Sequence, residues 1–218
     1  MVRPDHKLVV FAVCLSGMAG FIDALGFINM GGIFVSFMSG NSTRLGVGMT
    51  NSLSLSNLLP GIIIILFVFG VVFGSVISRY AKARRVPAIL GFVSGFLFIA
   101  ALLHTMSHSL SAMAFMVIAM GAVNILFEKD GEVKVGITYM TGTLVRMGQR
   151  LAAIFWGGPA WAWLKYAFLW LGLVAGAVVG AWAYSLLGLT SIWIAVGLSL
   201  ALTVSSRFID FQPSKLYE

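Results

Sequence analysis

The apolar runs of this chain restrict its fold more than any other feature of the sequence. Each run spans about 20 residues, the length at which a helix crosses roughly 30 Å of hydrocarbon. The six runs are residues 8–30, 58–79, 86–106, 109–127, 160–186 and 189–207. Only 10% of the 218 residues are charged, whereas about 25% are charged in a soluble domain. The sequence therefore predicts an all-α integral membrane protein with six transmembrane helices.

A β-barrel is the other structure that crosses a bilayer with its backbone polar groups satisfied. Barrel strands alternate apolar and polar side chains over about ten residues. Residues 61–74, with the sequence GIIIILFVFGVVFG, do not alternate in this way. Helices are therefore the expected spanning elements.

The N-terminal segment has some features of a signal peptide, because Arg3 and Lys7 precede an apolar core. The apolar run continues past Gly20 without a polar cleavage region. This continuation favours an uncleaved first span.

Lysine and arginine residues are sorted between the two ends of the predicted helices. With a cytoplasmic N-terminus, six crossings place Arg44 alone on the outer side, and Lys165 lies just inside the fifth span. The cytoplasmic set is Arg3, Lys7, Arg79, Lys82, Arg84, Arg85, Lys129, Lys134, Arg146, Arg150, Arg207 and Lys215. Because cytoplasmic loops are rich in Lys and Arg, we expect a multi-pass protein of the bacterial inner membrane with both termini cytoplasmic. This sorting explains the net charge of +7 without nucleic-acid binding.

The sequence repeats itself at a spacing of 102 residues. The polar stretch FMSGNSTRLG, at residues 37–46, aligns with YMTGTLVRMG, at residues 139–148. The further matches are Gly70 and Gly74 with Gly172 and Gly176 and, shifted by one residue, 20–23 with 121–124. The chain is therefore predicted to be a single membrane domain, residues 1–218, with repeat 1 at 8–107 and repeat 2 at 109–209.

Each repeat holds three spans and a polar stretch after its first span. Because three is odd, two such repeats in series have opposite orientations, related by a pseudo-two-fold axis in the membrane plane. Two structures are open for the polar stretches 33–50 and 134–152. Each is a re-entrant or broken half-helix, or each is a continuous helix. A continuous crossing at 33–50 would place the basic residues of 79–85 outside, against the charge distribution. The re-entrant or broken form is therefore preferred.

Glycines at four-residue spacing mark places where helices approach closely. The sets are Gly70 and Gly74, Gly91 and Gly95, and Gly172, Gly176 and Gly180. Packing inside one monomer explains all of them, so they do not require a partner.

The two polar stretches form the predicted solute-binding site. Irregular backbone at membrane depth is tolerated only where protein or a water-filled cavity satisfies it. Ser39 and Thr141 are suited to cap helices that begin near the bilayer centre. The positive ends of these helices, together with Arg44 and Arg146, would attract an anion. The predicted substrate-binding residues are Ser39, Gly40, Asn41, Arg44, Thr141, Gly142, Thr143 and Arg146.

Asp23 is an acidic residue inside a predicted span, and Asn124 is its neutral counterpart in the second repeat. Ionisable groups inside a membrane are costly and mark functional sites. We therefore predict a coupling role for Asp23 and Asn124, in which Asp23 binds a proton or balances the positive charge of the site. The alternative is a structural hydrogen bond, or a salt bridge between Asp23 and Arg44.

Three motifs carry a family resemblance: GFIDALGF at residues 20–27, FMSGNSTRLG at 37–46 and ITYMTGT at 137–143. With them the chain resembles the YoaK-like family of bacterial inner-membrane proteins, a domain-of-unknown-function family. Ser39 stands at the threonine of the family's Met-Thr-Gly-Asn motif. The resemblance covers nearly the whole chain and implies a six-span helical protein, but it brings no substrate.

These features predict a small inner-membrane transporter or channel that binds its solute at the midplane, where the two broken segments meet. The alternative is a non-transporting scaffold or accessory protein, and a cavity that reaches both polar stretches would favour transport. No catalytic acid, base and nucleophile converge, and no phosphate loop or zinc spacing occurs, so no enzymatic activity, cofactor or metal is expected. The expected partners are the lipid bilayer and a small polar or anionic solute. A homodimer is compatible with so small a bundle.

Overall fold

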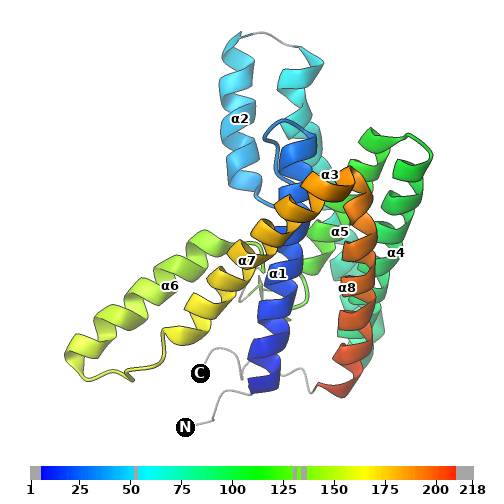
Figure 1. The fold of residues 1–218 in the computed structure, drawn as a ribbon. Helices are drawn as coiled ribbons and strands as arrows, with labels where there is room; N and C mark the ends of the chain where they lie inside the picture. Colours follow the sequence, from blue (N-terminus) through cyan, green and yellow to red (C-terminus); the bar gives the residue numbers. More distant parts are fainter. Residues whose placement is uncertain (1–5, 52–53, 130–131, 134–136, 210–218) are drawn as a thin grey trace.

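Helices make up nearly all of the chain in the computed structural model, which describes residues 6–51, 54–129, 132–133 and 137–209 (Figure 1). The α-helices are α1 (His6–Asn29), α2 (Met38–Asn51), α3 (Leu55–Ala81), α4 (Arg85–Thr105), α5 (Ser109–Val123), α6 (Met140–Ala153), α7 (Leu164–Leu187) and α8 (Ile192–Ser205). Short 3₁₀ helices are η1 (Lys82–Arg84), η2 (Ile154–Trp156), η3 (Gly188–Ser191) and η4 (Ser206–Phe208). The strands β1 (Glu128–Lys129) and β2 (Glu132–Val133) form one antiparallel pair. The predicted all-α fold is confirmed apart from this small hairpin.

Three stretches of the described chain are long and apolar enough to cross a membrane, judged by length and composition. They are His6–Asn29, Leu55–Thr105 and Leu164–Phe208. The second stretch turns at Lys82, where φ is 48°, from α3 into α4, and the third turns at Gly188, where φ is 60°, from α7 into α8. Helix α5 is apolar but shorter. The helices begin and end within a few residues of the predicted apolar runs.

Helix α1 lies in the core and packs along α7. The contacting pairs are Val13 with Gly172, Gly17 with Gly176, and Phe21 with Gly180. Because the numbers rise together, the two helices run in the same direction. A Cβ atom at Gly176 would overlap the backbone of Gly17, and one at Gly20 would overlap the Leu173 carbonyl. The predicted packing role of the Gly172, Gly176 and Gly180 set is therefore confirmed.

Helices α3 and α5 repeat this arrangement. The contacting pairs are Phe67 with Gly121, Gly70 with Ile118, and Gly74 with Ala122. A Cβ atom at Gly70 or Gly121 would overlap the facing backbone, so these helices lie side by side. Gly70 faces Ile118 and Gly74 faces Ala122, so the numbers rise together and the helices run in the same direction.

Helix α4 packs against α8 in the opposite direction. The Ser94 and Thr203 hydroxyls are 3.2 Å apart, and the Phe98 and Trp193 rings have centroids 5.5 Å apart. Gly91 and Gly95 lie on an exposed face of α4, where an added Cβ atom would have no neighbour within 4 Å. The prediction that this pair packs inside the monomer is therefore wrong.

One end of the bundle, the lower end in Figure 1, holds the start of α1 and the end of α8, and basic residues line two cavities there. Lys7 lines a cavity with Phe208, and Arg84 lines another with Arg207. Arg44 lies at the opposite end, next to the end of α1. These four basic residues therefore lie at the two ends of the bundle where the sequence predicted them, and which end faces the cytoplasm stays a prediction. Arg3, Lys134 and Lys215, together with residues 134–136 of the second polar stretch, lie outside the described residues.

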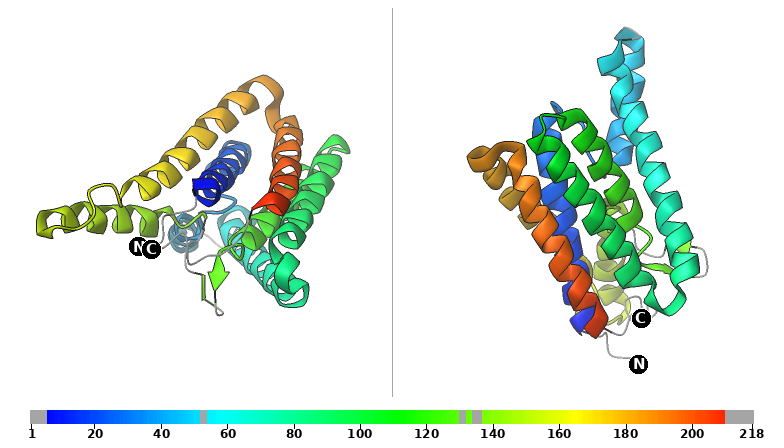
Figure 2. Two further views of the ribbon diagram at one scale, coloured as in Figure 1. Left: turned by 90° about the horizontal axis from the view of Figure 1, so that it is seen from below. Right: turned by 90° about the vertical axis from the view of Figure 1, so that its right-hand side faces the viewer.

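Helix α6 projects from the bundle together with the beginning of α7 (Figure 2). It packs mainly against α7. Its first residues nevertheless lie close to α1, because Met140 lines a cavity together with Asp23. The start of α6 thus lies near the centre of the fold, while its other end lies away from it.

Candidate functional site

Residues 30–37, which join α1 to α2, form the first break, and Asp23 fixes this break to α1. The Asp23 Oδ1 atom accepts hydrogen bonds from the backbone N–H groups of Val35, at 2.9 Å, and Ser36, at 2.7 Å. The Oδ2 atom accepts a hydrogen bond of 2.5 Å from the Ser36 hydroxyl. The carboxylate thus satisfies donors just before α2, where the positive helix end favours a negative group. The structural hydrogen bond that was the alternative for Asp23 is therefore present.

Residues 124–139, apart from the undescribed positions 130–131 and 134–136, form the second break. Here the Asn124 Oδ1 atom accepts hydrogen bonds from the backbone N–H of Thr138, at 3.3 Å, and from its hydroxyl, at 3.0 Å. Ser36 and Thr138 are 102 positions apart. Asn124 therefore holds the second break as Asp23 holds the first, with a neutral amide in place of a carboxylate.

Aromatic rings cover the first turns of α2 and α6 in the same way. A Cβ atom at Gly40 would lie 2.5 Å from the Phe37 ring, and one at Gly142 would overlap the Tyr139 ring. Gly40 and Gly142 therefore leave room for the ring three residues earlier. In the described chain their role is to shape the breaks.

Ser39 and Thr141 do not cap the two helices, so this prediction is wrong. The helices begin one residue earlier, at Met38 and Met140, and both predicted caps are exposed. The N-cap position of α6 is Tyr139, which makes no side-chain capping bond. The physical reason is tertiary: side chains of α1 and the end of α5 bind the donors that precede α2 and α6.

Asn41 is fully buried, and its side chain is a second group, after Asp23, that binds the backbone of the first break. Its Oδ1 atom accepts a hydrogen bond of 3.0 Å from the Phe34 N–H, and its Nδ2 atom donates one of 2.7 Å to the Phe34 carbonyl. Thr143, the equivalent residue, is also buried and donates a longer bond of 3.4 Å to the Tyr139 carbonyl. The Asn41 amide is therefore occupied by the protein's own backbone.

Arg44 and Arg146, predicted to act together, lie at different places. Arg44 is exposed, and its Nη2 atom donates a hydrogen bond of 3.1 Å to the Gly31 carbonyl. It therefore forms no salt bridge with Asp23. Arg146 lines a separate cavity of about 310 Å³, which lies between α6 and α7 and includes Arg150 and Tyr166.

A cavity of about 610 Å³ lies between α1, α7 and the two breaks. The first break contributes Phe34 and Phe37 to its wall, and the second contributes Thr138. The α1 residues are Gly20, Asp23, Ala24, Phe27 and Ile28, and the α7 residues are Leu173, Val174, Ala177, Val178 and Ala181. Both polar stretches of the sequence therefore reach one cavity.

The cavity combines apolar walls with two hydrogen-bonding groups. Phe27, Phe34 and Phe37 form an aromatic row with centroids 4.8 and 5.1 Å apart. A carboxylate has about four acceptor positions, and three hydrogen bonds reach Asp23. The Thr138 hydroxyl, which donates to Asn124, also retains acceptor capacity. The cavity therefore suits a small molecule with a hydrogen-bond donor or a positive charge.

Asp23 is the predicted site residue that lines this cavity, and Asn124 reaches it through Thr138. Thr138 and the aromatic row were missed, because Thr138, Phe34 and Phe37 lie in the breaks, Phe27 lies in an apolar helix, and none of them carries a charge. The match of Ser36 with Thr138 at the 102-residue spacing is the signal that could have found the threonine. Among the described residues, no group of three or more His, Cys, Asp or Glu side chains could hold a metal ion.

The family described as protein of unknown function (DUF1275) matches residues 11–205 of the chain. The chain belongs to this family. The DUF1275 match includes both breaks and every residue that lines the cavity. The UPF0700 transmembrane protein RA0705 of Rhizobium meliloti (strain 1021) is 35% identical over 199 residues, which cover 91% of this chain and 85% of the relative. No solved structure matches the chain.

These similarities confirm a membrane protein from a family of unknown function. The YoaK-like name itself stays a resemblance.

Proposed function

We propose that this DUF1275 protein carries or conducts a small solute across the bacterial inner membrane. In this proposal α1, α3, α4, α5, α7 and α8 cross the bilayer, with both termini in the cytoplasm. The gathering of basic residues at one end of the bundle supports this orientation. Helices α2 and α6 have 14 residues each, about 21 Å at 1.5 Å per residue, and both are rich in polar residues. Helices α5 and α8 are of similar length, but they are apolar, and α8 continues an apolar stretch long enough to cross. Helices α2 and α6 are the proposed re-entrant half-helices.

The directions of the helices support two inverted repeats, 8–107 and 109–209. Helix α1 runs parallel to α7, and α3 runs parallel to α5. Helix α4 runs antiparallel to α8 and, through a short turn, to α5 (Figure 2). Helix α8 turns back from α7 at Gly188 (Figure 1), so α1 and α5, the first helices of the two repeats, run in opposite directions. Such an arrangement is typical of transporters in which one repeat moves against the other around a central site.

The cavity shared by both breaks is the observation that carries the proposal. Transporter sites form where interrupted helices of two repeats meet, and here residues from both breaks line one space. A scaffold would not require such a space, so the cavity favours transport over the alternative of an accessory protein. The size of about 610 Å³ suits a small molecule.

The lining residues favour a solute that donates hydrogen bonds or carries a positive charge. Asp23 and Thr138 offer acceptors, and the aromatic row offers ring faces that attract cations. Neither Arg44 nor Arg146 lines this cavity, and the Asp23 carboxylate already occupies the positive end of α2. The proposed solute is therefore polar and neutral or cationic, and the anionic class has no support from the cavity.

Asp23 is also the proposed coupling residue. Protonation of its carboxylate would remove an acceptor and weaken the bonds that hold Val35 and Ser36. The first break would then be released from α1, whereas Asn124 keeps the second break fixed at any pH. In this proposal one half of the site responds to protons and the other does not.

Thermal unfolding of purified protein with added solutes tests the function, because a ligand that binds the folded state raises its apparent stability. The panel contains small ammonium and guanidinium compounds, neutral polyols and amides, and small anions. We expect cationic or neutral donors to raise the unfolding temperature in the wild-type protein. Thr138→Val, which removes a hydroxyl from the cavity wall, should reduce this shift.

Stabilisation by anions alone would contradict the proposed solute class. A panel without any stabilising solute, together with a lack of uptake into vesicles, would favour the scaffold. The homodimer also remains a proposal, and the exposed Gly91 and Gly95 face of α4 is where a second copy could approach closely.

A further inference from the structure

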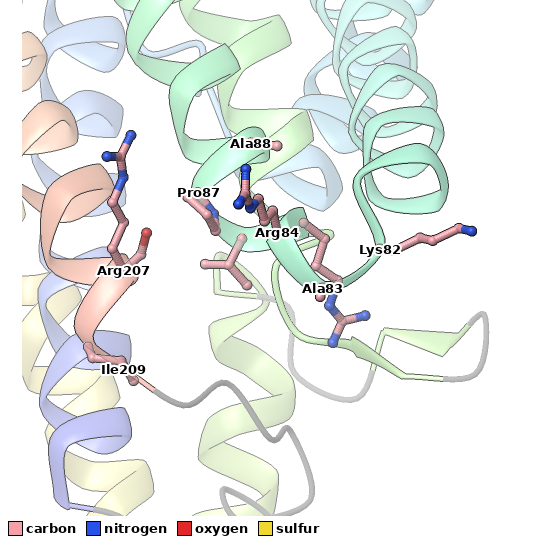
Figure 3. A pocket seen from close by; sticks show the side chains of 10 residues that line it. Lys82, Ala83, Arg84, Pro87, Ala88, Arg207 and Ile209 are labelled. Carbon is pink, nitrogen blue, oxygen red and sulfur yellow. The ribbon is translucent and has the colours of Figure 1, made fainter.

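A second cavity, of about 890 Å³, lies at the basic end of the bundle and is separate from the proposed solute site (Figure 3). It is formed by η1, the first turn of α4 and η4, which follows α8. Figure 3 shows Arg84 on one side of it and Arg207 on the other. These arginines come from segments more than a hundred residues apart in the sequence. The tertiary structure therefore creates this site.

The cavity concentrates positive charge. Its lining includes Lys82, Arg84, Arg85 and Arg207, and no carboxylate from the described residues lines it. Like charges that line one cavity repel one another, and an anion between them would offset this repulsion. Arginine binds phosphate oxygens through paired N–H donors, so a phosphate group is the anion that fits this lining.

Apolar residues lie next to the arginines and indicate an amphiphilic ligand. Val86, Pro87 and Ile209 form part of the same wall, and the neighbouring Phe208 is 79% exposed. The cavity also lies where α3 and α8 end and α4 begins, at one end of these apolar helices. A headgroup phosphate and the start of an acyl chain would meet both surfaces there.

We propose that this cavity binds the headgroup of an anionic phospholipid of the inner leaflet. Basic pockets between membrane helices on the cytoplasmic side bind such headgroups. Arg84 and Arg207 hold the phosphate, Arg85 and Lys82 add positive charge at the rim, and Pro87 and Ile209 contact the chain. A bound lipid would tie η1 to η4 and so join the two repeats at this end. The site is independent of the proposed transport function.

Native mass spectrometry of the full chain, delipidated and then mixed with phosphatidylglycerol, cardiolipin or phosphatidylcholine, tests the site. We expect the anionic lipids to bind in preference to phosphatidylcholine. Arg84→Gln combined with Arg207→Gln should weaken the binding of anionic lipids about thirtyfold. Each basic residue near an anionic surface strengthens binding about fivefold, and two are removed. Arg79→Gln combined with Arg150→Gln removes the same charge outside the cavity and should leave binding nearly unchanged.

Ala88→Leu provides a second variant that fills the cavity without changing the charge. It should also weaken anionic lipid binding. If the arginine variant does not fold, this variant still tests whether the lipid binds in the cavity. Equal weakening by the two charge variants would show general attraction to the basic end and overturn the site. Equal binding of phosphatidylcholine would overturn it as well. Competition by inorganic phosphate that displaces the lipid completely would assign the cavity to free phosphate instead.

Discussion

The Ser36 hydroxyl donates a hydrogen bond of 2.5 Å to the Asp23 carboxylate, and this bond ties the end of the first break to α1. Thr138 and Asn124 form the equivalent pair at the second break, at 3.0 Å. Asp23 lies in α1 and Asn124 directly follows α5, and their partners lie just before α2 and α6. The two halves therefore use equivalent hydrogen bonds, and the acceptor is a charged carboxylate in the first half and a neutral amide in the second.

Asp23 should contribute to stability through its acceptor atoms more than through its charge. Asp23→Ala leaves three donors without a partner, so we expect it to lower the free energy of unfolding by about 3 kcal/mol. Asp23→Asn keeps one acceptor oxygen, as Asn124 does naturally, and should cost about 1 kcal/mol. Thermal or denaturant unfolding in detergent measures both values.

Ser36→Ala is the control for this pair, because it removes one hydrogen bond and leaves the carboxylate in place. An intermediate loss is expected. If Asp23→Asn were as harmful as Asp23→Ala, the negative charge itself would hold the break. Solute uptake by Asp23→Asn across a range of pH then tests the proposed coupling role, and an unchanged pH profile would remove it.

Asn41 should matter for folding, whereas Arg44 should not. Asn41→Ala leaves the Phe34 N–H and carbonyl without their partner in a buried place, so we expect a loss of about 2–4 kcal/mol. Arg44→Gln removes one exposed bond to Gly31 and should cost less than about 1 kcal/mol. Unfolding curves of the two variants make the comparison. A stable Asn41→Ala protein that no longer responds to solute would instead place Asn41 in solute binding.

The glycines should separate into packed and open positions. Gly176→Ala places a methyl group in the backbone of α1 at Gly17, so we expect a loss of about 2 kcal/mol or more. Gly95→Ala meets open space and should raise the free energy of unfolding by about 0.5–1 kcal/mol, because alanine favours a helix. Both are single methyl additions inside long helices. A destabilised Gly95→Ala protein would indicate that α4 packs against a second copy.

The orientation in the membrane can be tested by cysteine labelling. After Cys14→Ser, which removes the natural cysteine, single cysteines replace Arg44 or Ala83. These positions lie at opposite ends of the bundle. We expect a membrane-impermeant thiol reagent to label Arg44→Cys in intact spheroplasts and Ala83→Cys only after the membrane is opened. Labelling of both positions from the same side would contradict an odd number of crossings between them.

The site was predicted only in part. Asp23 stood out because a carboxylate inside an apolar run is costly, and it lines the cavity. Ser39 and Thr141 matched a local capping pattern, but side chains far away in the sequence satisfy the breaks instead. Arg44 and Arg146 share a repeat position, yet their side chains contact different elements. Local patterns could not predict these outcomes, because each depends on a residue more than ten positions away.

The sequence by itself determined that the chain is helical, where its long helices lie, and that its two halves resemble each other. The first two properties follow from hydrophobicity and residue spacing over short distances along the chain, and the third follows from matches at a spacing of 102 residues. Only the tertiary structure decided which glycines pack, which polar groups satisfy the breaks, and which residues share a cavity. Gly176 and Gly95 have the same spacing pattern, but one faces a helix and the other faces open space. The physical reason is that a contact between distant segments depends on how helices are placed against one another.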